Sequence, residues 1–236
     1  MIELNKIYNE SCLDTMARMP DDFVDLTVTS PPYNLGKSHH TNKNRFDAYD
    51  IYDDHLPEDE YQASQVQILT ELYRITSSRG SCFYNHKNRI RDGLQISPYE
   101  WLLKTQWHIK QELVWCNGTP NMDNIRFYPM TERVYWLSKS PETGFVNKGS
   151  WLDFISITGE VTSGHHKRSF PLKLASMFIM GFDDAQIIYD PFMGSGTTAI
   201  AAHKAGKAWI GSEISAAYVE LANKRLEPYI AQISLF

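Results

Sequence analysis

The sequence predicts an α/β fold with a doubly wound, mostly parallel sheet in a single domain, 1–236. Two short apolar segments, 23–29 and 187–189, are each followed by prolines, which is typical of buried strands where the chain leaves a central ladder. Helical patterns at 57–76 and 197–204 follow these segments, so strands and helices alternate. The 236 residues, 42% of them hydrophobic, are enough for one such domain with a sizeable core.

The remaining elements are expected from the hydrophobic period and from the turn residues that bound them. In chain order they are a strand at 6–11, a helix at 12–19, a strand at 80–85, a helix at 98–105, strands at 109–116 and 133–138, a helix at 170–180, a strand at 207–213 and a helix at 216–230. The polar segment 35–54 is expected to be a long loop, and loops of that length are usually functional or disordered. The basic segment 86–91 is expected to be a second loop.

Composition and charge argue against several classes of protein. The chain has no apolar run of about 20 residues and no basic-then-apolar leader, so neither a membrane span nor a secretory signal is expected, and a cytoplasmic location is. The spacing of Cys12, Cys82 and Cys116 favours reduced thiols over a disulfide frame or a zinc site. The net charge of −5 means that a nucleic-acid partner would need a local basic face.

The strongest functional signal is a glycine turn between two strands. Asp190 and Pro191 end the first strand, and Gly194 and Gly196 then allow a tight turn that brings the backbone close to a ligand. An Ala-rich helix and a second strand follow, and Glu213 ends that strand. This is the layout of a nucleotide-binding βαβ unit, in which the later acid accepts hydrogen bonds from ribose hydroxyls.

The two acids beside this turn indicate the kind of ligand. Asp190 and Glu213 suit a neutral or cationic ligand better than a pyrophosphate, which favours helix N–H groups without a nearby acid. The expected cofactor is therefore S-adenosylmethionine, whose sulfonium is positive. A nicotinamide oxidoreductase would share the layout, but its GxGxxG pattern is absent because Ala199 stands where the third glycine would be. The other alternative is a turn with a purely structural role.

A second motif follows the strand at 23–29. In Ser30-Pro31-Pro32-Tyr33 the prolines remove backbone donors, so carbonyl oxygens and the Ser30 hydroxyl can accept hydrogen bonds from a ligand amino group. Such acceptors favour the nitrogen geometry needed for attack on a methyl sulfonium. The Tyr33 ring offers a flat face for a base, so Tyr33→Phe is expected to stay active. A rigid Pro-Pro turn is the structural alternative.

Together these motifs resemble the bacterial DNA amino-methyltransferases, S-adenosylmethionine-dependent enzymes that methylate an exocyclic base nitrogen. The catalytic motif precedes the cofactor motif, as in the permuted beta group of that family, and the resemblance covers nearly the whole chain. It implies the fold of S-adenosylmethionine-dependent methyltransferases and a catalytic role for Ser30, Pro31, Pro32 and Tyr33. The cofactor-binding residues that it implies are Ser11, Cys12, Phe170, Pro171, Asp190, Pro191, Phe192, Gly194, Ser195, Gly196, Thr197 and Glu213. Family members often carry an acid where Ser11 stands.

The motif also bears on the base. The form with Ser30 is similar to that of N4-cytosine methyltransferases, whereas most N6-adenine enzymes carry Asp there, so N4 of cytosine is favoured and N6 of adenine is the alternative. Chemistry at cytosine C5 is not expected, because none of the three cysteines neighbours a proline. No metal is expected, since the methyl donor is already activated by its positive sulfur.

Double-stranded DNA is the expected partner, because the base would be flipped into the pocket. The residues expected to contact DNA are Lys37, Lys43, Arg45, Lys87, Arg89, Arg91, Lys167 and Arg168. The segment 117–164 is expected to be a small variable insertion that takes part in target recognition. A homodimer and a cognate restriction endonuclease are compatible partners. The rival interpretations are an RNA or protein methyltransferase and a non-catalytic nucleic-acid binder.

Overall fold

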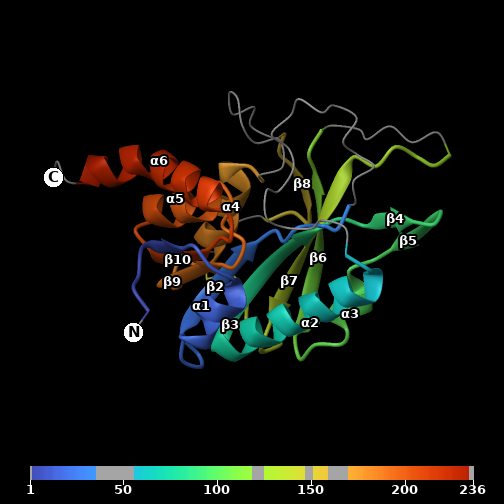
Figure 1. Ribbon diagram of the computed structural model, residues 1–236, viewed down its shortest axis with the longest axis horizontal. Coiled ribbons are helices and arrows are strands. Elements are labelled where there is room, and N and C mark those ends of the chain that lie inside the picture. The colour runs from blue at the N-terminus through green and yellow to red at the C-terminus, as the bar shows by residue number, and fades with distance from the viewer. Residues whose placement is uncertain (1, 36–55, 119–124, 147–150, 159–169, 234–236) are drawn as a thin grey trace.

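A computed structural model describes residues 2–35, 56–118, 125–146, 151–158 and 170–233. Its main feature is an eight-stranded sheet with the order β1-β10-β9-β2-β3-β7-β6-β8 (Figure 1). The strands are β1 (Lys6–Tyr8), β2 (Val24–Thr29), β3 (Thr76–His86), β6 (His108–Cys116), β7 (Thr131–Ser138), β8 (Phe154–Ser156), β9 (Ile187–Asp190) and β10 (Ala208–Ser212).

Most neighbouring strands of this sheet are parallel. The five strands β1, β10, β9, β2 and β3 form consecutive parallel pairs. Strand β7 is antiparallel to both β3 and β6, and β8 is parallel to β6. The mostly parallel sheet expected from the sequence is thus confirmed.

Helices cover both faces of the sheet, as a doubly wound fold requires. Side chains from α1 (Cys12–Ala17), α2 (Glu58–Ile75) and α3 (Tyr99–Leu102) pack in one core. Side chains from α4 (Leu172–Gly181), α5 (Thr197–Lys204) and α6 (Ala216–Ile233) pack in the other. Figure 1 shows the two groups of helices on different sides of the sheet.

The strands bury side chains on both faces because successive residues point in opposite directions. In β9, Ile188 belongs to the core under α4–α6, and Tyr189 belongs to the core under α1–α3. In β3, Phe83 lies in the core under α4–α6, and Tyr84 lies in the core under α1–α3. Consecutive apolar residues of one strand can therefore be buried in different cores.

Three local expectations need correction. The segment 86–91 is not a loop: Arg89–Arg91 forms β4, which pairs antiparallel with β5 (Leu94–Ile96) in a separate hairpin. Strand β3 begins at Thr76 rather than at residue 80, directly after α2. The helix expected at 98–105 is reduced to the four residues of α3.

The range 117–164, expected to be a variable insertion within the domain, includes two strands of the sheet. It contains β7, which lies between β3 and β6 in the sheet and whose side chains from Val134 to Leu137 are buried in the two cores. It also contains β8, which was not expected and which extends the sheet beside β6. Residues 119–124, 147–150 and 159–164 of this range lie outside the described residues.

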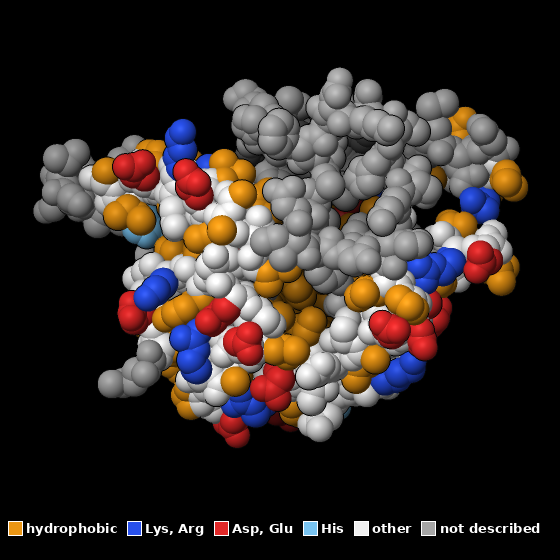
Figure 2. All heavy atoms as spheres, viewed as in Figure 1, with side chains coloured by type: hydrophobic (Ala, Val, Ile, Leu, Met, Phe, Trp, Pro, Cys, Tyr) orange, Lys and Arg blue, Asp and Glu red, His pale blue; other side chains and the backbone are white. Residues whose placement is uncertain are grey.

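The surface of the described residues is mixed in charge. On the face shown in Figure 2, acidic and basic side chains are interspersed, and the described residues of that face form no continuous basic patch. None of the described helices is long and apolar enough to cross a membrane.

Candidate functional site

The two sequence motifs lie together because their strands are neighbours. Strand β2, which ends at Thr29, pairs in parallel with β9, which ends at Asp190. Strand β9 pairs in parallel with β10, which ends one residue before Glu213. Parallel neighbours end at the same edge of a sheet, and this edge is where ligands bind in open α/β folds. Ser30, the glycine turn and Glu213 therefore belong to one site.

A buried hydrogen-bond network joins the two motifs through Asp190. One carboxylate oxygen accepts hydrogen bonds from the Thr29 hydroxyl at 2.8 Å and from the Phe192 backbone N–H at 3.0 Å. The other oxygen accepts one from the Thr198 hydroxyl at 2.7 Å. Only 1% of Asp190 is exposed, so the expectation that this acid faces a nucleoside directly is corrected. Its side chain connects the β2 end, the glycine turn and the start of α5.

Burial has a marked effect on the protonation of Asp190. Removal from water disfavours the charged form and raises the pKa of the carboxyl to about 6, although the Thr198, Phe192 and Thr29 hydrogen bonds act in the opposite direction. Nearby Glu213 adds a smaller upward effect on this pKa. The network therefore holds a carboxylate that is ionised at neutral pH in a site that penalises its charge.

The turn after β9 depends on its glycines. Gly194 and Gly196 have φ angles of 50° and 84°, in the left-handed region that favours glycine. A Cβ atom on Gly196 would lie 2.9 Å from the Cβ of Ala222 in α6, so a side chain would also clash. The turn is held from the other side by Arg225, whose guanidinium donates to the Ser195 carbonyl at 2.5 Å and hydroxyl at 2.6 Å.

Glu213 is positioned by the same turn. Its two carboxylate oxygens accept backbone hydrogen bonds from Gly194 and Ser215, each at 2.9 Å. The side chain is partly buried, and burial raises the pKa of its carboxyl. A carboxylate offers about four acceptor positions, so these two bonds leave capacity for ribose hydroxyls. The glycine turn and this partly exposed acid therefore fit the nucleoside of S-adenosylmethionine.

The other expected cofactor residues differ in exposure and in position. Pro191, Ser195 and Thr197 are buried in the turn, whereas Phe192 is partly exposed. The remaining four lie at the starts of helices, where Ser11 caps α1, Cys12 is the first residue of α1, Pro171 caps α4 and Phe170 precedes it. The Ser11 hydroxyl accepts a hydrogen bond from the Leu13 N–H at 3.2 Å. Burial raises the pKa of the Cys12 thiol to about 12, so it stays neutral.

The catalytic motif contains a polar cluster that the sequence did not reveal, formed by Ser30, Tyr33, Asn85 and Glu132. The Tyr33 hydroxyl lies 2.8 Å from the Ser30 hydroxyl and donates to the Glu132 carboxylate at 2.8 Å. The Asn85 amide nitrogen donates to the Tyr33 hydroxyl at 2.7 Å, to Glu132 at 3.0 Å and to Ser30 at 3.3 Å. The carbonyl oxygen of Asn85 is buried without a hydrogen-bond partner among the described residues.

One member of this cluster could have been found from sequence. Asn85 lies near the end of β3, the parallel neighbour of β2, so the strand-end rule places it beside Ser30. Glu132 carries no such signal, because it lies near the start of the antiparallel strand β7. Its position depends on the register of a strand pair that only the structure gives.

The Pro-Pro segment and Tyr33 are held by aromatic residues of the adjacent core. The Tyr61 hydroxyl donates to the Pro32 carbonyl at 2.8 Å and lies 2.7 Å from Nε2 of His86. The rings of Tyr33 and His86 are 4.5 Å apart between centroids and tilted by 40°. Burial lowers the pKa of His86 to about 3, so this imidazole is neutral at physiological pH. The Tyr33 ring, expected to offer a flat face to a base, thus has an aromatic neighbour in the protein.

The expected DNA contacts divide into three groups. Lys37, Lys43, Arg45, Lys167 and Arg168 lie outside the described residues. Lys87 is partly exposed, with its ammonium 5.9 Å from the Tyr33 ring centroid, which places it beside the catalytic motif.

The third group consists of Arg89 and Arg91. The Arg89 guanidinium is buried and binds both Glu58 carboxylate oxygens, at 2.8 and 2.6 Å, so its expected role in DNA contact is corrected to a structural one. Arg91 also binds Glu58, at 3.2 Å, but is partly exposed. Because both arginines bind Glu58, they fix the β4–β5 hairpin to α2.

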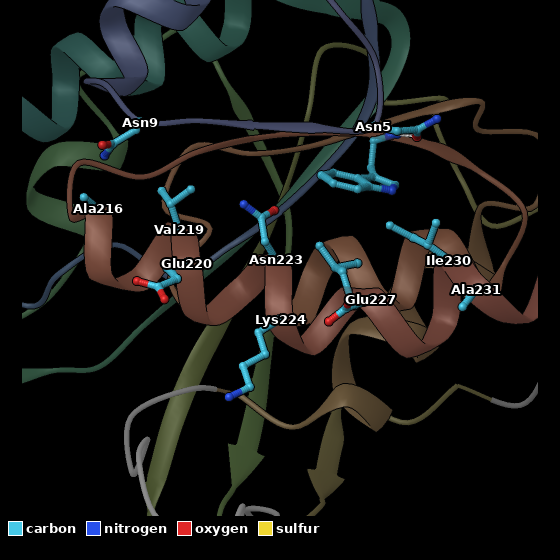
Figure 3. A pocket seen from close by; sticks show the side chains of 12 residues that line it. Asn5, Asn9, Ala216, Val219, Glu220, Asn223, Lys224, Glu227, Ile230 and Ala231 are labelled. Atoms are coloured by element: carbon cyan, nitrogen blue, oxygen red, sulfur yellow. Dashed lines mark hydrogen bonds between the residues drawn. The ribbon is translucent and has the colours of Figure 1, made fainter.

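A separate groove of about 870 Å³ lies between α6 and the β1–β10 edge of the sheet (Figure 3). The view shows Asn5 and Asn9 on the strand side and Val219, Asn223 and Ile230 on α6. None of the described residues lining this groove is an expected site residue, so the groove does not coincide with the site predicted from the sequence. Among the described residues, no group of three or more His, Cys, Asp or Glu side chains is arranged to hold a metal ion.

Comparison with known structures shows the same fold in DNA methyltransferases. The PvuII DNA methyltransferase, described as cytosine-N4-specific, superposes with a TM-score of 0.75 over 94% of this chain and 86% of that one, at 19% sequence identity. A DNA modification methylase of Thermus thermophilus, whose structure contains S-adenosyl-L-methionine, superposes with a TM-score of 0.69 at 19% identity over 95% of this chain and 93% of that one.

Sequence comparison gives a consistent result. The type II methyltransferase M.ScaI of Streptomyces caespitosus is 27% identical over 94% of this chain and 81% of its own length. M.BglII of Bacillus subtilis is 25% identical over 93% of this chain and 68% of its own length. The family model described as DNA methylase of the N6/N4 type matches residues 24–224, which includes both motifs of the site. The chain therefore belongs to the N6/N4 DNA methylase family.

Proposed function

We propose that this protein transfers a methyl group from S-adenosylmethionine to the exocyclic N4 of a cytosine flipped out of double-stranded DNA. The observation that carries the proposal is the junction of the two motifs through Asp190, which bonds Thr29 at the catalytic side and Phe192 and Thr198 at the cofactor side. Ser30 is thereby fixed beside the turn that accommodates the nucleoside. The order of the motifs supports assignment to the permuted beta group.

The residues present fit S-adenosylmethionine. The Glu213 carboxylate would accept hydrogen bonds from the ribose hydroxyls, and the turn from Gly194 to Thr197 leaves backbone close to the ligand. The bound cofactor supplies an electrophilic methyl group on a positive sulfur. Family membership makes an exocyclic amino nitrogen of DNA the acceptor class, and the serine of the catalytic motif favours cytosine over adenine.

The chain's own residues have distinct roles in this proposal. The Ser30 hydroxyl and the Pro31 carbonyl accept hydrogen bonds from the target amino group, and the Tyr33 ring stacks on the base. Tyr61 holds the Pro32 carbonyl, so the motif is already in place before DNA binds. Lys87 and Arg91 are the described basic residues that remain candidates for phosphate contacts. Target recognition is assigned to the part of 117–164 outside β7 and β8.

The deciding experiment is methyl transfer from labelled S-adenosylmethionine to unmethylated duplex DNA, followed by digestion and mass analysis of the nucleosides. The expected product is N4-methylcytosine. N6-methyladenine alone would overturn the cytosine assignment while keeping the reaction class. Methyl on cytosine C5 would refute the mechanism. Label in RNA or protein but not in DNA would favour the rival methyltransferases, and S-adenosylmethionine binding without any transfer would indicate a non-catalytic binder.

A further inference from the structure

The cluster of Ser30, Tyr33, Asn85 and Glu132 has a fixed direction of hydrogen bonding. An ionised carboxylate only accepts, so the single proton of the Tyr33 hydroxyl is directed to Glu132, 2.8 Å away. The Tyr33 oxygen is then left as an acceptor, and the Ser30 hydroxyl at 2.8 Å donates to it. Ser30 therefore presents lone pairs, and no proton, to the remainder of the site.

We propose that Glu132 is the final proton acceptor of the methyl-transfer reaction, reached from the target nitrogen through Ser30 and Tyr33. This inference rests on the proposed function. It adds a role for Glu132 and for the Tyr33 hydroxyl, whereas the sequence assigned Tyr33 only a stacking face. Asn85 is a positioning residue in it, because its amide nitrogen donates to Ser30, Tyr33 and Glu132.

The step balances without any added reactant. As the bond between nitrogen and the methyl carbon forms, the bond between that carbon and sulfur breaks and the sulfur leaves as a neutral thioether. The nitrogen then loses one proton to the Ser30 oxygen, Ser30 passes its own proton to the Tyr33 oxygen, and Tyr33 passes its own to the Glu132 carboxylate. The positive charge of the nitrogen and the negative charge of Glu132 are removed together.

The relay also makes Ser30 a stronger hydrogen-bond acceptor, closer in strength to an aspartate at the same position. A serine hydroxyl alone is a weaker acceptor than a carboxylate, but hydrogen-bonded chains polarise one another at low dielectric. The Glu132 charge, transmitted through two hydroxyls, gives Ser30 part of the acceptor strength that an aspartate would have. Glu132 is partly buried, so product release can return its proton to water.

Several charged or titratable groups surround this path and must be kept constant in its test. From β3 and the following residue they are His86 and Lys87, which face the Tyr33 ring. Arg133, next to Glu132 on β7, is bound to Glu112 of β6 at 2.8 Å. Burial lowers the pKa of His86 to about 3, so His86 does not change charge in the pH range of an activity assay.

The chain contains a matched control for the Tyr33–Glu132 contact. The Tyr99 hydroxyl donates to the Glu112 carboxylate at 2.8 Å, the same distance and chemistry. This second pair joins α3 to β6 and does not belong to the catalytic cluster. Tyr99→Phe therefore controls for removal of a tyrosine hydroxyl elsewhere in the fold, and it leaves the ion pair between Glu112 and Arg133 in place.

The test is a single-turnover assay in which enzyme preloaded with labelled S-adenosylmethionine is mixed with excess unmethylated duplex DNA. Glu132→Gln and Tyr33→Phe should each lower the rate by about 10²-fold or more. The double variant should be no slower than the slower single variant, because both substitutions interrupt one path. Cofactor affinity and unfolding midpoint should stay close to wild type, and Tyr99→Phe should keep the wild-type rate.

Two results would overturn the relay. A Glu132→Gln variant with the wild-type rate would show that the carboxylate takes no part. Rate losses that multiply in the double variant would show that Glu132 and Tyr33 do not act in one path. A wild-type enzyme that labels no DNA would instead refute the proposed function itself, so the two failures are distinguishable.

Discussion

Replacing Asp190 by Asn should change how the stability of the protein depends on pH. Burial raises the pKa of this carboxyl from 3.8 to about 6. Because the folded pKa is the higher one, the folded state binds more protons than the unfolded state between these values. Stability from this group is therefore full below the unfolded pKa and is lost as the pH rises through the folded pKa. The total loss is about 3 kcal/mol, at about 1.4 kcal/mol for each pKa unit.

The substitution is nearly isosteric and leaves the network satisfied. The asparagine carbonyl can keep the hydrogen bonds from Thr29 and Phe192, and its amide nitrogen can donate to the Thr198 oxygen. The Thr198 hydroxyl then donates to the Val28 carbonyl, which already lies 3.1 Å away. Asp190→Asn should therefore remain folded and lose only the charge.

Urea unfolding at several pH values measures the effect directly. Between about pH 5 and about pH 7.5, the free energy of unfolding of the wild type should fall by about 1.4 kcal/mol relative to that of Asp190→Asn. Asp184→Asn, in the exposed turn before β9, controls for the loss of one negative charge. Parallel curves for wild type and Asp190→Asn would refute the assignment of a raised pKa to this carboxyl.

Three further predictions concern the cofactor turn and the hairpin. Glu213→Ala should weaken S-adenosylmethionine binding by about 1–3 kcal/mol in calorimetry, whereas Glu220→Ala on α6 should not, and equal affinities for both variants would contradict the ribose contact. Gly196→Ala should destabilise the protein by about 1–3 kcal/mol in urea unfolding, because of its φ of 84° and the 2.9 Å approach to Ala222; an unchanged midpoint would show that α6 can move away. Arg89→Ala should lower the free energy of unfolding by at least about 1 kcal/mol and leave the salt dependence of DNA binding unchanged. A smaller salt slope in this variant would instead show that Arg89 contacts DNA, as first expected.

The cofactor unit could be predicted because its signals are local. The proline after Asp190, the glycines of the turn and the Ala-rich helix lie within one short segment, and each restricts the backbone directly. Strand β8 and the β4–β5 hairpin could not be predicted in this way. Each of their strands has three residues, which is too short for a hydrophobic period, and their pairing depends on partners elsewhere in the chain.

The errors at Asp190 and Arg89 have a common cause. The sequence shows that a charged residue follows a strand or lies in a basic segment, but it does not show the direction of the side chain. Asp190 points into a network with Thr29 and Thr198, and Arg89 finds Glu58 on a helix that begins 31 residues earlier. A charged side chain whose partner is distant in sequence is easily assigned to a ligand when it belongs to the core.

Glu132 shows the opposite error. Nothing in the sequence marks this residue as functional, yet it lies at the centre of the catalytic cluster. The parallel strands β2 and β3 bring Ser30 and Asn85 to the ligand edge from their carboxyl ends. Strand β7 is antiparallel, so its amino-terminal end reaches the same edge and delivers a carboxylate there. A methylase with serine in its catalytic motif can thus regain a negative charge through the neighbouring strand. It follows that the acceptor strength at Ser30 depends on Glu132 as well as on the motif, and that the serine by itself is an incomplete guide to the methylated base.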